Sequence, residues 1–562
     1  MGHVDLGWPV LAAVSAAALS GGWLAASADT CDVLTGWNMP VDLSVADVQS
    51  DDANARFAWD TFVAVCWPQD ATGQPGAPDT SISICDVAAA GIPPVFLEYM
   101  MPQQAFLPDG ANPGTWESPT EPKSVYGPTP ESELRVIGSL TKATSIGQLI
   151  GTFDQADIDK PIIDQNGNYV LYEIYMNRSE FEWLSENGYY DANNQYGAFP
   201  VGGTPTFVGL PQVGDASLPA WAQQGAFELK TSWKQLDQDE IDGGRFFTRD
   251  VYYQSNYPDT DPLCGPVTVG LVGMHVMRLT HNMRHTWFHA TFEHVDNVET
   301  NLPPPATPSF NPGPDGTCPP PYSQGYTCQA SICEEPGTDD SCTASQIQLG
   351  TGPNVCDANP DETINISRIT EMTIPAVVAS VNTEYQDELP APWKYYELIN
   401  TIHPEDNGPC CIQPLATNTI SDCWMTNTTM ESYTQYFPTG DISGFAFPKC
   451  GSTTAASLNC TDCHAAGMSY GAPVDQWGFP EPTVENPDGT KYQIFTFLLF
   501  HAEKSCPSDV TYDGDTNADD IIRVVDDWAC EGTDCTADAD QSGAVNISDL
   551  LTVLNGWGSC GG

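Results

Sequence analysis

Residues 509–557 contain two copies of a segment whose oxygen-bearing side chains are spaced like the ligands of a hard cation. The copies, DVTYDGDTNADDIIRVVDDW and DADQSGAVNISDLLTVLNGW, are offset by 29 positions throughout. Calcium takes roughly six to eight oxygens, and a twelve-residue loop supplies them from alternate positions, with a glycine at the sharp turn. Gly514 and Gly543 occupy that turn. The sequence therefore predicts two Ca²⁺ sites, with ligands Asp509, Thr511, Asp513, Asp515 (backbone carbonyl), Asn517 and Asp520 in the first loop and Asp538, Asp540, Ser542, Ala544 (backbone carbonyl), Asn546 and Asp549 in the second.

Each loop continues into a segment with apolar residues on one face of a helix. These residues are Ile521, Val525 and Trp528 in the first copy and Leu550, Leu554 and Trp557 in the second. Because one such unit is too small to bury its apolar stripe, the two helices are expected to pack stripe against stripe. The alternative is a pair of acidic surface loops, which does not explain a loop repeated in register with its helix.

The paired units resemble a type I dockerin, the calcium-binding module that attaches secreted enzymes to a cohesin partner. The resemblance covers residues 506–562. It implies an α-helical pair of EF-hand-like calcium units and a cohesin-like partner. Loop positions 10 and 11, which contact cohesin in that family and are often Ser or Thr, are Ala518–Asp519 and Ile547–Ser548 here.

A second motif is the CxxCH sequence at 460–464. Covalent attachment of haem needs two thiols spaced to reach two vinyl groups, followed by a histidine that ligates the iron. The motif predicts haem c bound covalently by Cys460 and Cys463 and ligated by His464. The alternative is a Cys460–Cys463 disulfide, or a redox pair, beside an unrelated histidine. The sixth iron ligand stays open among His501, Met425 and Met430.

The region around this motif resembles an uncharacterised group of exported proteins that carry a c-type cytochrome haem motif. The segments that carry the resemblance are WDTFVAVCWP (59–68), PIIDQNGNYVLYEIYMN (161–177), FELKTSWK (227–234), GLVGMHVM (270–277) and HATFEHVDN (289–297). The resemblance implies a haem protein and no particular substrate.

A third set of residues could act in catalysis. Segments 267–279 and 286–297 are predicted to form a hairpin, which would bring His275 near His289 and place Glu293 on the same face. With His294 and Asp296, these residues form a candidate metal or acid–base site. The alternative is that they only satisfy polar groups at a sheet surface or a turn.

Charge excludes two classes of partner. The chain has 74 acidic and 18 basic residues, a net charge of −56. Such a field repels nucleic acid and anionic membrane surfaces. The 19 cysteines indicate disulfides in an oxidising compartment. The apolar run that begins at Trp8 and the small residues 26–28 indicate a signal peptide over 1–28, hence an exported protein that is periplasmic, cell-surface or secreted and has no membrane span in its mature form.

Segment patterns predict a multi-domain, β-rich chain. Short β-branched and aromatic segments separated by turn residues, such as 169–176 and 225–236, favour an antiparallel β-rich domain over 29–301. A Pro/Cys-rich linker or insertion over 302–365 follows, then a small mixed region of helix and loop with the haem motif over 366–505, and the calcium units over 506–562. A helix is expected around 367–390, with a break at Ile374–Pro375.

The leading hypothesis is an exported monohaem cytochrome-like protein with an electron-transfer or redox role, whose redox partner or small-molecule substrate is open. A haem-dependent oxidoreductase activity fits this hypothesis. The alternatives are a secreted carbohydrate-active enzyme such as a glycoside hydrolase, or an extracellular scaffold protein, anchored through the dockerin-like module.

Overall fold

The structure is a computed structural model of the 562-residue chain. The residues that it describes are 36–44, 47, 50–70, 73–86, 91–120, 135–138, 164–166, 168, 170–198, 206, 208–211, 223–254, 264–280, 286–298, 308–310, 374–402, 427–430, 436–438, 455–457, 496, 498–499, 502, 504–512, 515–530, 537–540 and 544–559.

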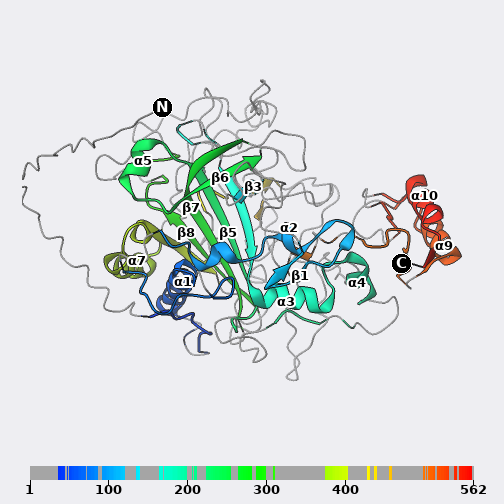
Figure 1. The fold of residues 1–562 in the computed structure, drawn as a ribbon, viewed down its shortest axis with the longest axis horizontal. Coiled ribbons are helices and arrows are strands. Elements are labelled where there is room, and N and C mark those ends of the chain that lie inside the picture. The colour runs from blue at the N-terminus through cyan, green and yellow to red at the C-terminus, as the bar shows by residue number, and fades with distance from the viewer. Residues whose placement is uncertain are drawn as a thin grey trace, which may run out of the picture.

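A seven-stranded sheet, antiparallel except for one strand pair, forms the centre of the described structure (Figure 1). Its strands are β3 (Arg135–Gly138), β4 (Leu171–Met176), β5 (Phe227–Gln235), β6 (Thr248–Gln254), β7 (Cys264–Thr280), β8 (Thr286–His294) and β9 (Tyr396–Ile402). The long strand β7 pairs with β5 along one edge and with β6 and then β8 along the other. At the edges of the sheet, β4 pairs with β5 and β9 pairs with β8, both antiparallel. Strand β3 pairs with β6 and is parallel to it.

The antiparallel β-rich architecture predicted from the sequence is confirmed. The predicted hairpin is β7 and β8, in which His275 lies opposite Thr291 and Met277 opposite His289. Strand β9 comes from the predicted 366–505 region, so this region and the predicted β-rich region 29–301 contribute strands to the same sheet.

Two helices cover the apolar face of the sheet. Helix α1 (Asp51–Cys66) begins at Ser50, whose side chain accepts a hydrogen bond from the Ala53 N–H, and it contacts α7 (Ala376–Glu388) and β9. The Trp59 ring of α1 stacks on Tyr385 of α7 at 5.1 Å and meets Phe292 of β8 edge-on at 5.1 Å. Aromatic pairs of this kind each stabilise by about 0.5–1.5 kcal/mol beyond their buried area. The helix expected around 367–390 is α7 in its described part, and it begins directly after Pro375.

The described chain has further, mostly short elements outside the seven-stranded sheet. They are η2 (Val95–Glu98), α2 (Pro102–Ala105), η3 (Pro108–Gly110), β1 (Gly114–Thr115), β2 (Ser118–Pro119), α3 (Arg178–Asn187), α4 (Ala192–Gly197), α5 (Gln238–Gly243), η7 (Trp393–Tyr395), β10 (Tyr436–Pro438), β11 (Ala455–Ser457), β12 (Asp515–Thr516) and β13 (Gly558–Ser559).

The C-terminal helices α9 (Ala518–Asp526) and α10 (Ile547–Asn555) lie at one end of the molecule, beyond α4 and away from the sheet (Figure 1). Each helix begins at an asparagine, Asn517 or Asn546, whose side chain accepts a hydrogen bond from a first-turn N–H. Val524 and Val553 are fully buried in the small core between these helices.

The predicted packing of the two apolar stripes is wrong for their outer residues. Ile521 and Leu550 pack against the small core, but Val525, Trp528, Leu554 and Trp557 are 48–55% exposed. The buried contact is one position away from the predicted stripe, at Val524 and Val553, because the buried carboxylates Asp520 and Asp549 lie on that side of each helix, one turn earlier, and it faces inward.

Within the described part of the chain, no helix combines the length and the apolar character that crossing a bilayer requires.

Candidate functional site

One face of the sheet is lined by polar and charged side chains that are buried. They are Tyr172 of β4, Glu228, Lys230 and Ser232 of β5, His275 of β7, and His289, Thr291 and Glu293 of β8. None of them is more than 6% exposed. Because burying charged groups without partners is costly, this polar face needs a covering layer that supplies hydrogen bonds.

The segment 427–430 supplies part of that layer. The Thr428 backbone N–H and hydroxyl donate to the two carboxylate oxygens of Glu293, at 2.8 and 2.6 Å. The Asn427 amide donates to Thr291 Oγ1 at 2.9 Å, and the Thr429 hydroxyl lies 2.6 Å from that of Ser232. These contacts fix the segment across β5 and β8.

A glycine permits this close approach. Gly273 of β7 lies opposite Glu293. A Cβ atom at this position would lie 2.5 Å from Thr429 Oγ1 and 2.6 Å from Ser232 Oγ. Any other residue would therefore push segment 427–430 away from the sheet.

Two carboxyl groups, Glu180 of α3 and Glu228 of β5, interact beside this polar face. Both are buried, at 1% exposure, and the Thr496 hydroxyl donates to Glu228 Oε1. Burial raises the pKa of Glu228 to about 7. Burial, and then the neighbouring Glu228, raise the pKa of Glu180 well above its usual range. The pair therefore holds at least one proton at neutral pH.

The predicted approach of His275 and His289 is confirmed: they are diagonal neighbours on adjacent strands, and each faces the polar side. Burial, and then the nearby His275 and Lys230, lower the pKa of His289 to about 3. His289 is therefore neutral at pH 7. Glu293 shares this face as predicted, but both of its oxygens bind Thr428, so it anchors a segment. Within the described residues, these side chains do not form a group of three metal-ligating atoms.

His294 and Asp296 belong to a different environment, so the single predicted constellation is wrong for them. The His294 ring stacks on Phe246 at 3.9 Å and meets Tyr396 edge-on. Asp296 binds the Arg245 guanidinium through two hydrogen bonds of 2.6 Å. Successive strand residues point to opposite faces, so His294 lies on the opposite side of β8 from Glu293, where it packs in the core.

In the first predicted calcium loop, one carboxylate closes the loop on itself. Oδ1 of Asp520 accepts hydrogen bonds from the N–H groups of Val510 and Thr511, at 2.8 and 2.9 Å. Oδ2 of Asp520 accepts from the Asn517 N–H at 2.7 Å. Asp509 is buried at the start of the loop, whereas Asp515 is exposed.

The second loop repeats this geometry. Asp549 Oδ1 accepts from the N–H groups of Ala539 and Asp540, at 2.7 and 3.1 Å, and Oδ2 accepts from the Asn546 N–H at 2.7 Å. The carbonyl of Ala544 accepts from the Asn546 side chain at 2.8 Å. One oxygen each from Asp538, Asp540 and Asp549 lies within 4.8 Å of the others, so the three carboxylates form a group that can hold a cation.

The remaining predicted site residues lie outside the described part of the chain. They are the haem-motif residues Cys460, Cys463 and His464, the loop residues Asp513 and Ser542, and the candidate iron ligands Met425 and His501. The predicted signal peptide, 1–28, also lies outside it. Met430 is described and is fully buried. Of the cysteines, Cys85, Cys506 and Cys530 take part in disulfides, and Cys66 is a free buried thiol.

Sequence patterns did not single out Glu180, Glu228 or Lys230. The alternation of Glu228 and Lys230 with apolar neighbours in β5 is typical of a strand with one solvent-exposed face. Here that face is covered by segments from residues 427–430 and 496, which are distant in sequence. Only information on which distant segments contact β5 could have revealed that Glu228 and Lys230 are buried.

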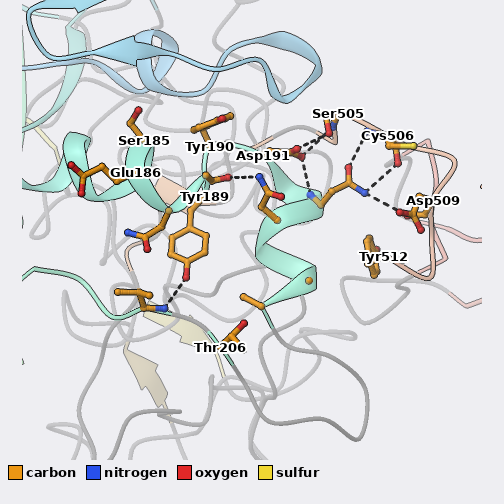
Figure 2. Close-up of a pocket in the computed structure, with 17 residues that line it drawn as sticks. Ser185, Glu186, Tyr189, Tyr190, Asp191, Thr206, Ser505, Cys506, Asp509 and Tyr512 are labelled. Carbon is orange, nitrogen blue, oxygen red and sulfur yellow. Dashed lines mark hydrogen bonds between the residues drawn. The ribbon is translucent and has the colours of Figure 1, made fainter. Parts of the chain in front are cut away.

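A polar cavity of about 850 Å³ lies between the α3–α4 region and the start of the C-terminal unit (Figure 2). Its lining includes Tyr189, Asp191 and Asn193 on one side and Ser505, Asp509 and Tyr512 on the other. Hydrogen bonds that Asp191 and Asn193 form with residues 505–509 hold the two sides together, and Figure 2 draws those between Asp191 and Ser505.

No family model, curated protein or solved structure matches this chain.

Proposed function

We propose that the chain is an exported redox protein that binds one haem covalently through Cys460 and Cys463, with His464 as an iron ligand, and exchanges electrons with a redox partner or a small-molecule substrate. The CxxCH sequence at 460–464 carries this proposal. The haem, when bound, supplies the one-electron couple.

The surroundings of the motif support this proposal. Residues 427–430 precede the motif and Thr496 follows it, and both bind the polar face of the sheet. Segments on either side of the motif in sequence thus contact the face that holds His275, His289 and Glu228. A buried carboxyl pair that holds a proton can accept or release it when a nearby charge changes, which suits a redox site.

The test is the visible spectrum of protein made in a host that attaches haem c. A Soret band should remain with the protein after extraction with acidified acetone, which removes haem that is not covalently bound. Cys460→Ser and Cys463→Ser should weaken or abolish this retention, whereas Cys66→Ser, which changes a free buried thiol elsewhere, should leave it intact. A colourless wild-type protein from that host would contradict the proposal.

The C-terminal unit is proposed to bind two Ca²⁺ ions and to act as a dockerin-like module. The support is the 29-residue repeat together with the matched hydrogen bonds of Asp520 and Asp549, which hold corresponding positions of the two loops in one geometry. Calcium would be bound by the oxygens of these loops. The exposed Val525, Trp528, Leu554 and Trp557 offer an apolar surface for a cohesin-like partner.

A further inference from the structure

The start of the C-terminal unit is bound to α4 by a continuous set of hydrogen bonds. The Asp191 carboxylate, at the N-terminus of α4, accepts from the Ser505 N–H at 3.1 Å and from the Ser505 hydroxyl at 2.5 Å. The Asn193 side chain accepts from the Cys506 N–H at 3.0 Å and donates to the Cys506 carbonyl at 3.2 Å. The segment that leads into the loop–helix units is therefore fixed to α4 and does not act as a flexible linker.

The first loop itself contacts α4 through Tyr512. The Tyr512 ring stacks on the Tyr196 ring of α4, with centroids 4.2 Å apart and planes 8° from parallel. Tyr512 has a φ of +58°, a left-handed conformation that costs a residue with a side chain about 1–3 kcal/mol. Asp520 holds the N–H groups of Val510 and Thr511, the two residues just before Tyr512. The closed shape of the loop thus sets the direction of the Tyr512 ring.

The second loop is tied to the same place. The Lys504 ammonium donates to the backbone carbonyl of Asp538, the first residue of the second loop, at 2.7 Å. It also lies 5.4 Å and 5.7 Å from the ring centroids of Tyr196 and Tyr512. Lys504 is 4% exposed, so these interactions are shielded from solvent. The Tyr196–Tyr512 stack and Lys504 therefore join α4 to both loops.

Charge gives this contact a dependence on cations. Asp509 of the first loop and Asp191 of α4 line the same cavity, and the whole chain has a net charge of −56. Like charges at this range repel, and a divalent cation in the loop reduces that repulsion. A cation bound in this loop would also stabilise the closed shape that the Asp520 hydrogen bonds give it, in which Tyr512 stacks on Tyr196.

We propose that α4 is an intramolecular docking surface for the calcium unit, and that cation binding in the first loop and docking on Tyr196 stabilise each other. The inference rests on the proposed calcium sites. Coupling between two equilibria is reciprocal. A change on α4, which supplies none of the predicted ligands, must therefore change the calcium affinity of the first loop.

The test is calorimetric titration of the full chain, stripped of divalent cations, with CaCl₂. The wild-type chain should bind two ions. In Tyr196→Ala, the affinity of one site should fall by about 5-fold or more, the lower end of common coupling strengths. Tyr196→Phe keeps an aromatic ring for the stack and should bind like the wild type. Tyr190→Ala removes a tyrosine that lines the same cavity and should change neither site.

A second variant covers the case in which Tyr196→Ala does not fold. Asn193→Ala removes the hydrogen bonds to Cys506 and Asp509, and it should also weaken one calcium site. Two sites of unchanged affinity in both α4 variants would overturn the docking proposal and leave the calcium sites standing. A wild-type chain that binds no calcium would overturn the calcium sites and, with them, the coupling.

Discussion

Thr428 and Glu293 form a double hydrogen bond that fastens a short segment onto the sheet. The backbone N–H and the hydroxyl of Thr428 donate to the two carboxylate oxygens of Glu293, which is completely buried. Both groups are removed from water, so the interaction is strong only while both partners remain. This pair fixes the chain that enters the proposed haem region.

Replacing Glu293 by Gln should therefore destabilise the protein. The amide loses the negative charge and one acceptor, and hydrogen bonds to a buried charge contribute about 1.5–3 kcal/mol. We expect the free energy of unfolding to fall by about 2 kcal/mol in urea denaturation followed by tryptophan fluorescence. Glu384→Gln, at a side chain that is 52% exposed, is the matched control and should change stability by less than about 0.5 kcal/mol. Equal effects of the two changes would show that the Glu293–Thr428 bonds contribute little.

The Glu180–Glu228 pair should make the protein less stable as pH rises. The folded-state pKa of Glu228, about 7, lies above its ordinary value of 4.5. Between these two pH values, the folded state therefore binds more protons than the unfolded state. The stability that this residue contributes is complete below about pH 4.5 and is lost as pH rises through 7, on the order of 3 kcal/mol in all. In Glu228→Gln this loss should be much smaller, as measured by urea unfolding at pH 5 and pH 8. A variant with the wild-type slope would contradict the assignment.

His289 should act in the opposite direction. Its folded-state pKa of about 3 lies below the ordinary 6.5, so the folded state binds fewer protons than the unfolded state. The stability associated with the neutral ring is complete above about pH 6.5 and is lost as pH falls, by about 2–3 kcal/mol between pH 6.5 and 4.5. His289→Gln, which cannot be protonated in this range, should lose less stability than the wild type over the same interval. Its denaturation midpoints at the two pH values provide the measurement.

Calcium should bind in the ratio of two ions to one chain, and each loop should depend on its last carboxylate. Asp549→Asn, or Asp520→Asn, should reduce the ratio to one, because the amide supplies fewer charged oxygens to the cation. Equilibrium dialysis with metal analysis measures the ratio. Asp526→Asn, at an exposed position of α9 outside the loop, is the control and should retain two ions. Chelation should also lower the melting temperature of the full chain, because calcium at 100 times its Kd would stabilise the folded state by about 2.7 kcal/mol.

Local patterns in the sequence predicted the strands well where β-branched and aromatic residues were enriched and partly alternated with polar ones. The segments around 169–176, 225–236 and 267–297 became β4, β5 and the β7–β8 hairpin. The predicted pairing within the β7–β8 hairpin was also correct, because His275 and His289 face the same side of the sheet. Helix α1 was not foreseen within a region predicted to be strand-rich. Its residues from Phe57 to Cys66 are buried with one intermediate exception, Asp60, so no polar face marks the helical period.

The candidate site was only partly predictable, for a physical reason. Sequence spacing could single out candidate loop ligands because their pattern is local: all twelve positions of a loop are contiguous. The burial of Glu228 and Glu293 depends instead on Thr496 and residues 427–430, which lie more than a hundred positions away from them. His294 was misplaced although strand alternation alone puts it on the opposite side of β8 from Glu293, where it packs against Phe246 and Tyr396.

The most direct test of the account is the intact mass of the mature chain, purified under denaturing conditions from a host that attaches haem c. We predict an added mass equal to one haem, located by peptide mapping on the peptide that contains Cys460 and Cys463. A chain whose mass equals that of its processed polypeptide, with those two cysteines joined in a disulfide, would contradict the proposed redox function.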